Sequence, residues 1–133
     1  MFLIVGVPAA ALLLRRDSRT SARIKEMVSI KYMKQMRIRI TAVRKASYPD
    51  LMAKYENPIE HTCDVLEGQE WISIDGRCPE GMCPSAWGSM KEFVEALARG
   101  EGNFYDGWMK NPNSAMISCN DGFRPVSFYI EVI

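Results

Sequence analysis

"MRIRITAV", residues 36–43, is the stretch of sequence that decides the fold. Its apolar side chains alternate with two arginines and a threonine, which is the period-two pattern of a strand with one buried face. "RPVSFYIEVI", residues 124–133, shows the same alternation at the far end of the chain. We expect these two strands to be neighbours in one sheet, and the residues that we expect to face inward from the second are Val126, Phe128, Ile130 and Val132.

The segment between them predicts one main helix and several shorter elements. "SAWGSMKEFVEALARGEG" (85–102) carries apolar residues at the three-four spacing of a helix, and Gly100 is a suitable C-terminal stop. The apolar face consists of Trp87, Met90, Phe93, Val94 and Leu97. A short helix is expected at "PDLMAKYE" (49–56), and short strands at "QEWISI" (69–74) and "SAMISC" (114–119). Residues 36–133 are therefore predicted to form a single small α+β domain with a mostly antiparallel sheet.

Charge is distributed unevenly along the 133 residues. Residues 1–46 hold eleven Lys and Arg against two acidic residues (+9), whereas residues 47–133 hold six against fourteen (−8). These sum to the net charge of +1. Because contacts to phosphates need a basic surface, we expect the acidic body not to bind nucleic acid.

Residues 1–35 resemble an appendage to this domain. An apolar run is followed by a Ser/Arg-rich stretch, in which Ile24, Met27 and Val28 have helical spacing. Three interpretations remain open: a basic amphipathic helix at a membrane surface, an organelle transit peptide, or a start codon placed too early, with Met33 or Met36 as the true start. The third is favoured slightly.

The apolar run at residues 1–14 decides the expected compartment. No Lys or Arg precedes it, no small-residue cleavage site follows it, and it is shorter than the roughly 20 residues of a spanning helix. A cytoplasmic location with reduced or metal-bound cysteines is therefore expected.

Four cysteines lie in the acidic body, and three of them are candidate metal ligands. Cys78 and Cys83 are close together, whereas Cys63 and Cys119 stand alone, so the two tandem pairs of a typical zinc site are missing. The expected elements place Cys63, Cys83 and Cys119 near turns at one edge of the sheet, and His61 is a further candidate ligand. Zinc or iron would suit such a site, while four packed thiols are the alternative.

Cys83 is the most informative cysteine because Pro84 follows it. Proline suits the first position of a helix, which places Cys83 at the N-cap, beside unsatisfied amides and the positive end of the helix dipole. That position favours a thiolate, the form that acts as a nucleophile or a metal ligand. Catalysis would also need a base, and His61 is the only histidine.

A different kind of site is expected at "GNFYDGWMKNP", residues 102–112. Phe104, Tyr105 and Trp108 are candidates for the wall of a small-molecule pocket, although such residues more often cover the end of a core. Arg124 is a candidate contact for an anion, with a local ion pair to Asp121 as the alternative.

The body also resembles a family of small cysteine-containing proteins, each of about ninety residues, from anaerobic bacteria and archaea. The resemblance runs from about residue 36 to residue 133. It is carried by "EGQEW" (67–71), "CPEGMCPSAW" (78–87), "GNFYDGWM" (102–109) and "SCNDGFRPVSFYIE" (118–131). It implies that residues 1–32 are an extension or a misplaced start, and that cysteines recur at positions 63, 83 and 119, with Cys78 additional. That family has no established activity, so the resemblance implies none for this protein.

Two functions therefore remain open from the sequence. The first is binding of a transition metal, or thiol redox chemistry, at clustered Cys63, Cys83 and Cys119. The second is a ligand- or partner-binding module that uses the aromatic loop 104–108. A thiol hydrolase with Cys83 and His61 is a third, less favoured alternative.

Overall fold

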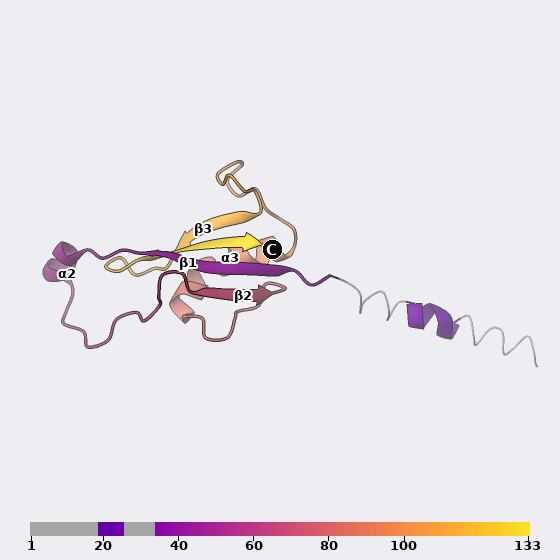
Figure 1. Ribbon diagram of the computed structural model, residues 1–133, viewed down its shortest axis with the longest axis horizontal. Helices are drawn as coiled ribbons and strands as arrows, with labels where there is room; N and C mark the ends of the chain where they lie inside the picture. Colours follow the sequence, from indigo (N-terminus) through magenta and orange to yellow (C-terminus); the bar gives the residue numbers. More distant parts are fainter. Residues whose placement is uncertain (1–18, 26–33) are drawn as a thin grey trace, which may run out of the picture. The chain divides into compact units, whose positions relative to one another are not determined.

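A four-stranded antiparallel sheet organises the body of the protein (Figure 1). The computed structural model describes residues 19–25 and 34–133, and the chain divides into two units, Met1–Lys34 and Gln35–Ile133. The strands of the second unit are β1 (Arg37–Lys45), β2 (Glu70–Ile74), β3 (Ser114–Ser118) and β4 (Val126–Val132), in the spatial order β2-β1-β4-β3. The α+β class expected from the sequence is confirmed.

The two strands with the clearest alternation form the centre of the sheet. Ile40 of β1 lies opposite Ile130 of β4, and Ala42 lies opposite Phe128. All four side chains are buried on one face, as their period-two spacing predicts. After Ala42 the register shifts by one residue, so that Arg44 pairs with Ser127. Beyond this bulge, β1 continues past the end of its neighbouring strand β2.

Helix α3 (Pro84–Ala98) covers the apolar face of the sheet. Pro84 occupies its first turn, and Gly100, with φ of +78°, follows its end in the left-handed conformation that glycine adopts without a steric penalty. Its buried residues are Ala86, Met90, Val94 and Leu97. The predicted apolar face is thus correct at three positions, whereas Trp87 and Phe93 lie at its margin and are only partly buried.

Helix α2 (Pro49–Tyr55) has a different relation to the core, because none of its residues is buried. The chain on either side of it is tied to the segment between β3 and β4, where the amide of Tyr48 donates to the carbonyl oxygen of Phe123 (2.9 Å). In Figure 1, α2 lies beyond the end of the sheet rather than over either face. Polar contacts therefore anchor this helix.

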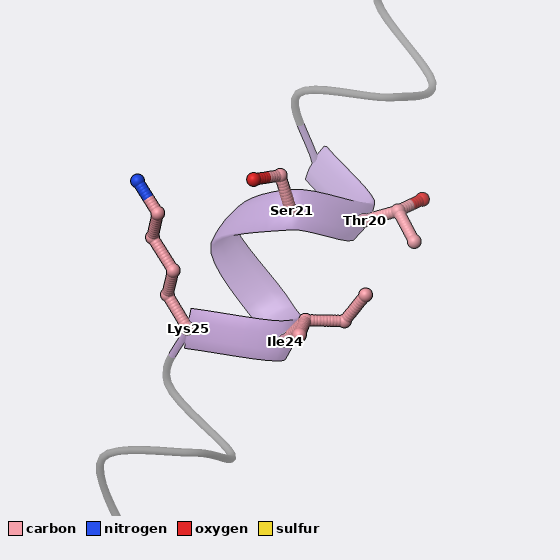
Figure 2. Close-up of a pocket in the computed structure, with 4 residues that line it drawn as sticks. All are labelled: Thr20, Ser21, Ile24 and Lys25. Carbon is pink, nitrogen blue, oxygen red and sulfur yellow. The ribbon is translucent and has the colours of Figure 1, made fainter.

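In the first unit, the described part is a short helix over residues 19–25 whose residues are all exposed. Figure 2 shows Thr20, Ser21, Ile24 and Lys25, whose side chains project outward from this single helix. Met27 and Val28, which the predicted amphipathic helix also includes, lie outside the described residues, as does the apolar run 1–14.

Candidate functional site

The segment from Gly102 to Asn113 between α3 and β3 is tightly closed at its base. The amide of Asn103 donates to the carbonyl oxygen of Pro112 (2.7 Å). A Cβ atom at position 102 would lie 2.5 Å from that same oxygen, so this approach of two backbones requires glycine. The base of the loop is therefore fixed by the backbone itself.

The tip of the loop is held by Asn103. Its side-chain oxygen accepts a hydrogen bond from the amide of Gly107 (2.9 Å), and its carbonyl oxygen accepts one from the amide of Asp106 (3.2 Å). Asn103, Tyr105, Asp106 and Gly107 all have positive φ, between +51° and +93°. Asparagine and glycine tolerate this region, but an aromatic residue such as Tyr105 adopts it rarely.

This backbone presents a row of aromatic rings. Phe104 packs edge-on against Phe93 of α3, with ring centroids 5.0 Å apart, and Tyr105 lies 6.5 Å from the same Phe93 ring. Trp108 packs edge-on against Tyr105 at 5.3 Å. Tyr105 and Trp108 remain 76% and 44% exposed. We call Phe93, Phe104, Tyr105 and Trp108 the aromatic platform.

A cavity of about 230 Å³ opens at this platform and is lined by Glu92, Phe93, Phe104 and Tyr105. Phe104 and Tyr105 line it as the sequence predicted, whereas Trp108 supports Tyr105 from outside the lining. The two lining residues from α3, Glu92 and Phe93, were not predicted from the sequence as part of this site. The spacing of Phe93 predicts a core residue, and no sequence signal distinguishes Glu92 from Glu95, the other acidic residue of the helix.

Three of the four cysteines lie around one end of the sheet. Lys45 of β1 and Val126 of β4 are register partners there. The Lys45 ammonium donates to the carbonyl oxygen of Cys63 (3.2 Å), and the Val126 amide donates to the sulfur of Cys119 (3.3 Å). This end of the sheet therefore lies next to both cysteines.

The start of α3 reaches the same end. The hydroxyl of Ser85, two residues after Cys83, donates to the side-chain oxygen of Asn120, which directly follows Cys119. Cys83 is the N-cap residue, as predicted, but its side chain makes no capping hydrogen bond. Its sulfur instead packs partly buried against the core.

The three cysteines at this end of the sheet do not form a metal centre. Within residues 19–25 and 34–133, no three His, Cys, Asp or Glu side chains are grouped so that they could hold a metal ion. The predicted ligand set of Cys63, Cys83, Cys119 and His61 is therefore not assembled in this structure. Cys63, Cys83 and Cys119 are each partly buried against the core cluster, and His61 is exposed. All four cysteines are free thiols, and Cys78 is exposed.

The expected catalytic pair is likewise not formed among the described residues, since no hydrogen bond joins Cys83 to His61. The Cys83 sulfur lies against the core, whereas His61 lies exposed in the segment between α2 and β2.

Arg124 forms a contact that the sequence analysis did not foresee. Its guanidinium donates to both carboxylate oxygens of Glu56, at 2.6 and 2.9 Å, rather than pairing with Asp121. These hydrogen bonds lower the pKa of Glu56, with the charge of Arg124 adding to the effect and desolvation opposing it. Asp121 instead accepts from the amides of Phe123 and Arg124. The cation predicted to contact an anionic ligand is thus engaged within the protein.

Comparisons with protein families, with curated proteins and with solved structures found no match for this chain. The part of the chain that the structure describes contains no helix with the length and apolar character needed to cross a membrane.

Proposed function

We propose that this protein is a binding module whose ligand site is the aromatic platform. The observation that carries the proposal is the left-handed backbone of Tyr105, in a loop that hydrogen bonds hold closed and that leaves the ring exposed. Such a backbone costs of order 1–3 kcal/mol for a residue other than glycine.

The energetic cost of this backbone conformation argues against a loop whose only role is to cover the end of the core. Core closure is already provided by Phe104 and Phe93, which are partly buried against the core cluster. Glycine at position 105 would allow the same backbone without the steric penalty. A tyrosine at this position directs an aromatic ring outward, where it borders the cavity, and this arrangement suits recognition of a ligand.

The loop also has the rigidity that binding favours. Asn103 and Pro112 fix its base and tip before any ligand arrives. A ligand that enters the cavity therefore needs to order few side chains, which lowers the entropic cost of association.

The test is a titration of isotope-labelled protein with two probes, choline and its neutral carbon analogue 3,3-dimethylbutan-1-ol, followed by amide NMR shifts. We expect at least one probe to shift the signals of residues 102–109. Tyr105→Ala should remove the shifts, whereas Tyr55→Ala, which changes another largely exposed tyrosine, on α2, should preserve them. Absence of shifts with both probes would contradict the proposal.

A second candidate function rests on the position of Cys63, Cys83 and Cys119 around one end of the sheet. We propose that these thiols bind a transition metal such as zinc or iron, or undergo thiol redox chemistry. Because the sulfurs are not grouped into a centre, the metal itself would have to draw them together, so that binding would be coupled to a local rearrangement. Four free thiols are also consistent with the reducing cytoplasm that we propose as the location.

Elemental analysis of protein purified without oxygen tests the metal version. About one equivalent of metal is expected for a closed thiolate site. It should be lost in Cys119→Ser and retained in Cys78→Ser, because Cys78 is exposed and outside this set. Metal-free protein that also shows no oxidation-dependent change at Cys83 or Cys119 would rule out this candidate.

The two candidates are separable in the same preparation. Cys83→Ser should leave the probe titration unchanged if the aromatic platform is the site. If Cys83→Ser abolishes binding and Trp108→Ala does not, the cysteine end of the sheet becomes the better candidate.

A further inference from the structure

We infer that the cavity at the aromatic platform binds a small alkylammonium cation. This inference rests on the proposed function, and it specifies the chemical class of the ligand. The lining combines three aromatic rings with one carboxylate, Glu92, and contains no basic side chain.

The first support for this inference is the unpaired carboxylate of Glu92 at the cavity. On α3, Lys91 pairs with Glu95 (3.8 Å), and at the end of the helix Arg99 pairs with Glu101 (3.0 Å). Glu92, within the described part of the chain, forms neither an ion pair nor a hydrogen bond. The exposed Glu92 carboxylate is therefore a negative charge at the cavity that pairs with neither Lys91 nor Arg99.

The second support is the arrangement of the rings. The planes of Phe93 and Phe104 are inclined at 69°, and those of Phe93 and Tyr105 at 50°. Inclined rings leave aromatic faces to border a space, whereas stacked rings would cover one another. The face of an aromatic ring carries the negative part of its quadrupole, and it attracts a cation within about 6 Å.

Other ligand classes fit this lining less well. An anion would be repelled by Glu92 and would find no basic partner in the lining. A divalent metal ion needs several oxygen, nitrogen or sulfur ligands, and the lining supplies one carboxylate. An alkylammonium group places methyl or methylene groups against the rings and its charge near the carboxylate, so it uses both features.

The volume limits the size of the ligand. A cavity of about 230 Å³ lies below the roughly 300–1,000 Å³ of pockets for drug-sized molecules, so it suits a headgroup of a few heavy atoms. We therefore assign it to a free small cation and not to an extended polymer.

The experiment compares choline with 3,3-dimethylbutan-1-ol, which has the same shape but no charge. Full-length labelled protein is titrated with each probe, and the amide shifts of residues 102–109 give the dissociation constants. We expect choline to bind at least about tenfold more tightly, as a carboxylate and aromatic faces discriminate a cation from its neutral analogue. Glu92→Gln should remove most of that preference, whereas Glu95→Gln, on the same helix but outside the lining, should retain it.

Each outcome has a distinct meaning. Equal binding of the two probes, or tighter binding of the neutral one, would overturn the cation assignment and leave the binding module in place. Failure of both probes to bind would overturn both proposals. Sedimentation of the protein with phosphatidylcholine vesicles, without binding of free choline, would replace the small cation by a lipid surface and so overturn the assignment.

Discussion

Arg124 and Glu56 are 68 residues apart in sequence and form a bidentate ion pair, in which the two terminal guanidinium nitrogens each donate to one carboxylate oxygen. Their side chains are only 19% and 16% exposed. Since α2 buries no residue of its own, this ion pair is the main side-chain link between the end of α2 and the segment that precedes β4. The position of α2 therefore depends on charge.

The first prediction concerns pH. The hydrogen bonds from Arg124 lower the folded-state pKa of Glu56 below its ordinary value of 4.5. The stabilisation is therefore complete above about pH 4.5 and is lost as the pH falls through the lowered value. We expect the amides of Leu51–Tyr55 to lose protection from hydrogen exchange in this range, before the amides of β1 and β4.

A matched variant isolates this carboxylate. The pKa of Glu101 is also lowered, chiefly by its hydrogen bond from Arg99, but that pair lies on the surface after α3. Glu56→Gln should flatten the pH response of α2, and Glu101→Gln should not. A response that persists in Glu56→Gln would show that another group anchors α2.

The second prediction compares two glycines. Gly102→Ala would place a Cβ 2.5 Å from the Pro112 oxygen and should reduce the free energy of unfolding by about 1–3 kcal/mol, because the loop base must open. Gly88→Ala, within α3, meets no atom within 4 Å and should raise it by about 1 kcal/mol. Urea unfolding measures both values.

The same pair of variants reports on the proposed site. Gly102→Ala should also weaken probe binding, because the aromatic platform stands on the loop base, whereas Gly88→Ala should leave binding unchanged. Normal binding by Gly102→Ala would mean that the closed base is not needed to position the rings.

The third prediction concerns the reactivity of the cysteines. Cys78 is exposed, whereas the sulfurs of Cys63, Cys83 and Cys119 are partly buried against the core. Iodoacetamide at neutral pH should therefore modify Cys78 first, as peptide mass mapping would show. In Cys78→Ser the fast phase should disappear, and a fast phase that remains at Cys83 would instead support an activated nucleophile.

The fourth prediction concerns the first unit. Among residues 19–25 and 34–133, every buried core side chain lies between Ile38 and Ile130, within the unit Gln35–Ile133. A chain that begins at Met33 should thus unfold cooperatively in urea, with a free energy of unfolding within about 0.5 kcal/mol of the value for the full chain. Loss of cooperative unfolding would show that residues 1–32 contribute to the fold.

The helices and strands could be predicted from the sequence because each depends on a local pattern of residues. The alternation at residues 36–43 and 124–133 predicted β1 and β4, and the three-four spacing with Pro84 and Gly100 predicted α3. The helix expected at 49–56 is present as α2, although it forms no part of the core.

The candidate site could be predicted from the sequence only in part, because it depends on contacts between distant segments of the chain. The loop gave Phe104 and Tyr105, but Glu92 joins them only once α3 and the loop have been placed. The partner of Arg124 was missed for the same reason, since 68 residues separate it from Glu56. The positive φ of Tyr105 has no local sequence signal either, because tyrosine does not favour that conformation.

The central pairing of β1 with β4 also constrains how the protein is made. As the ribosome releases the chain, β1 emerges with Ile38 and Ile40 unsheltered, and its main partner β4 is synthesised only after β2, α3 and β3. Before Val132 has emerged, α3 has only an incomplete sheet to cover. A sheet closed by such distant segments has a high contact order, which slows folding. The nascent chain therefore has a prolonged interval in which chaperones can bind it, and a stop codon within β4 would release a product in which β1 and β3 lack part of their shared neighbour.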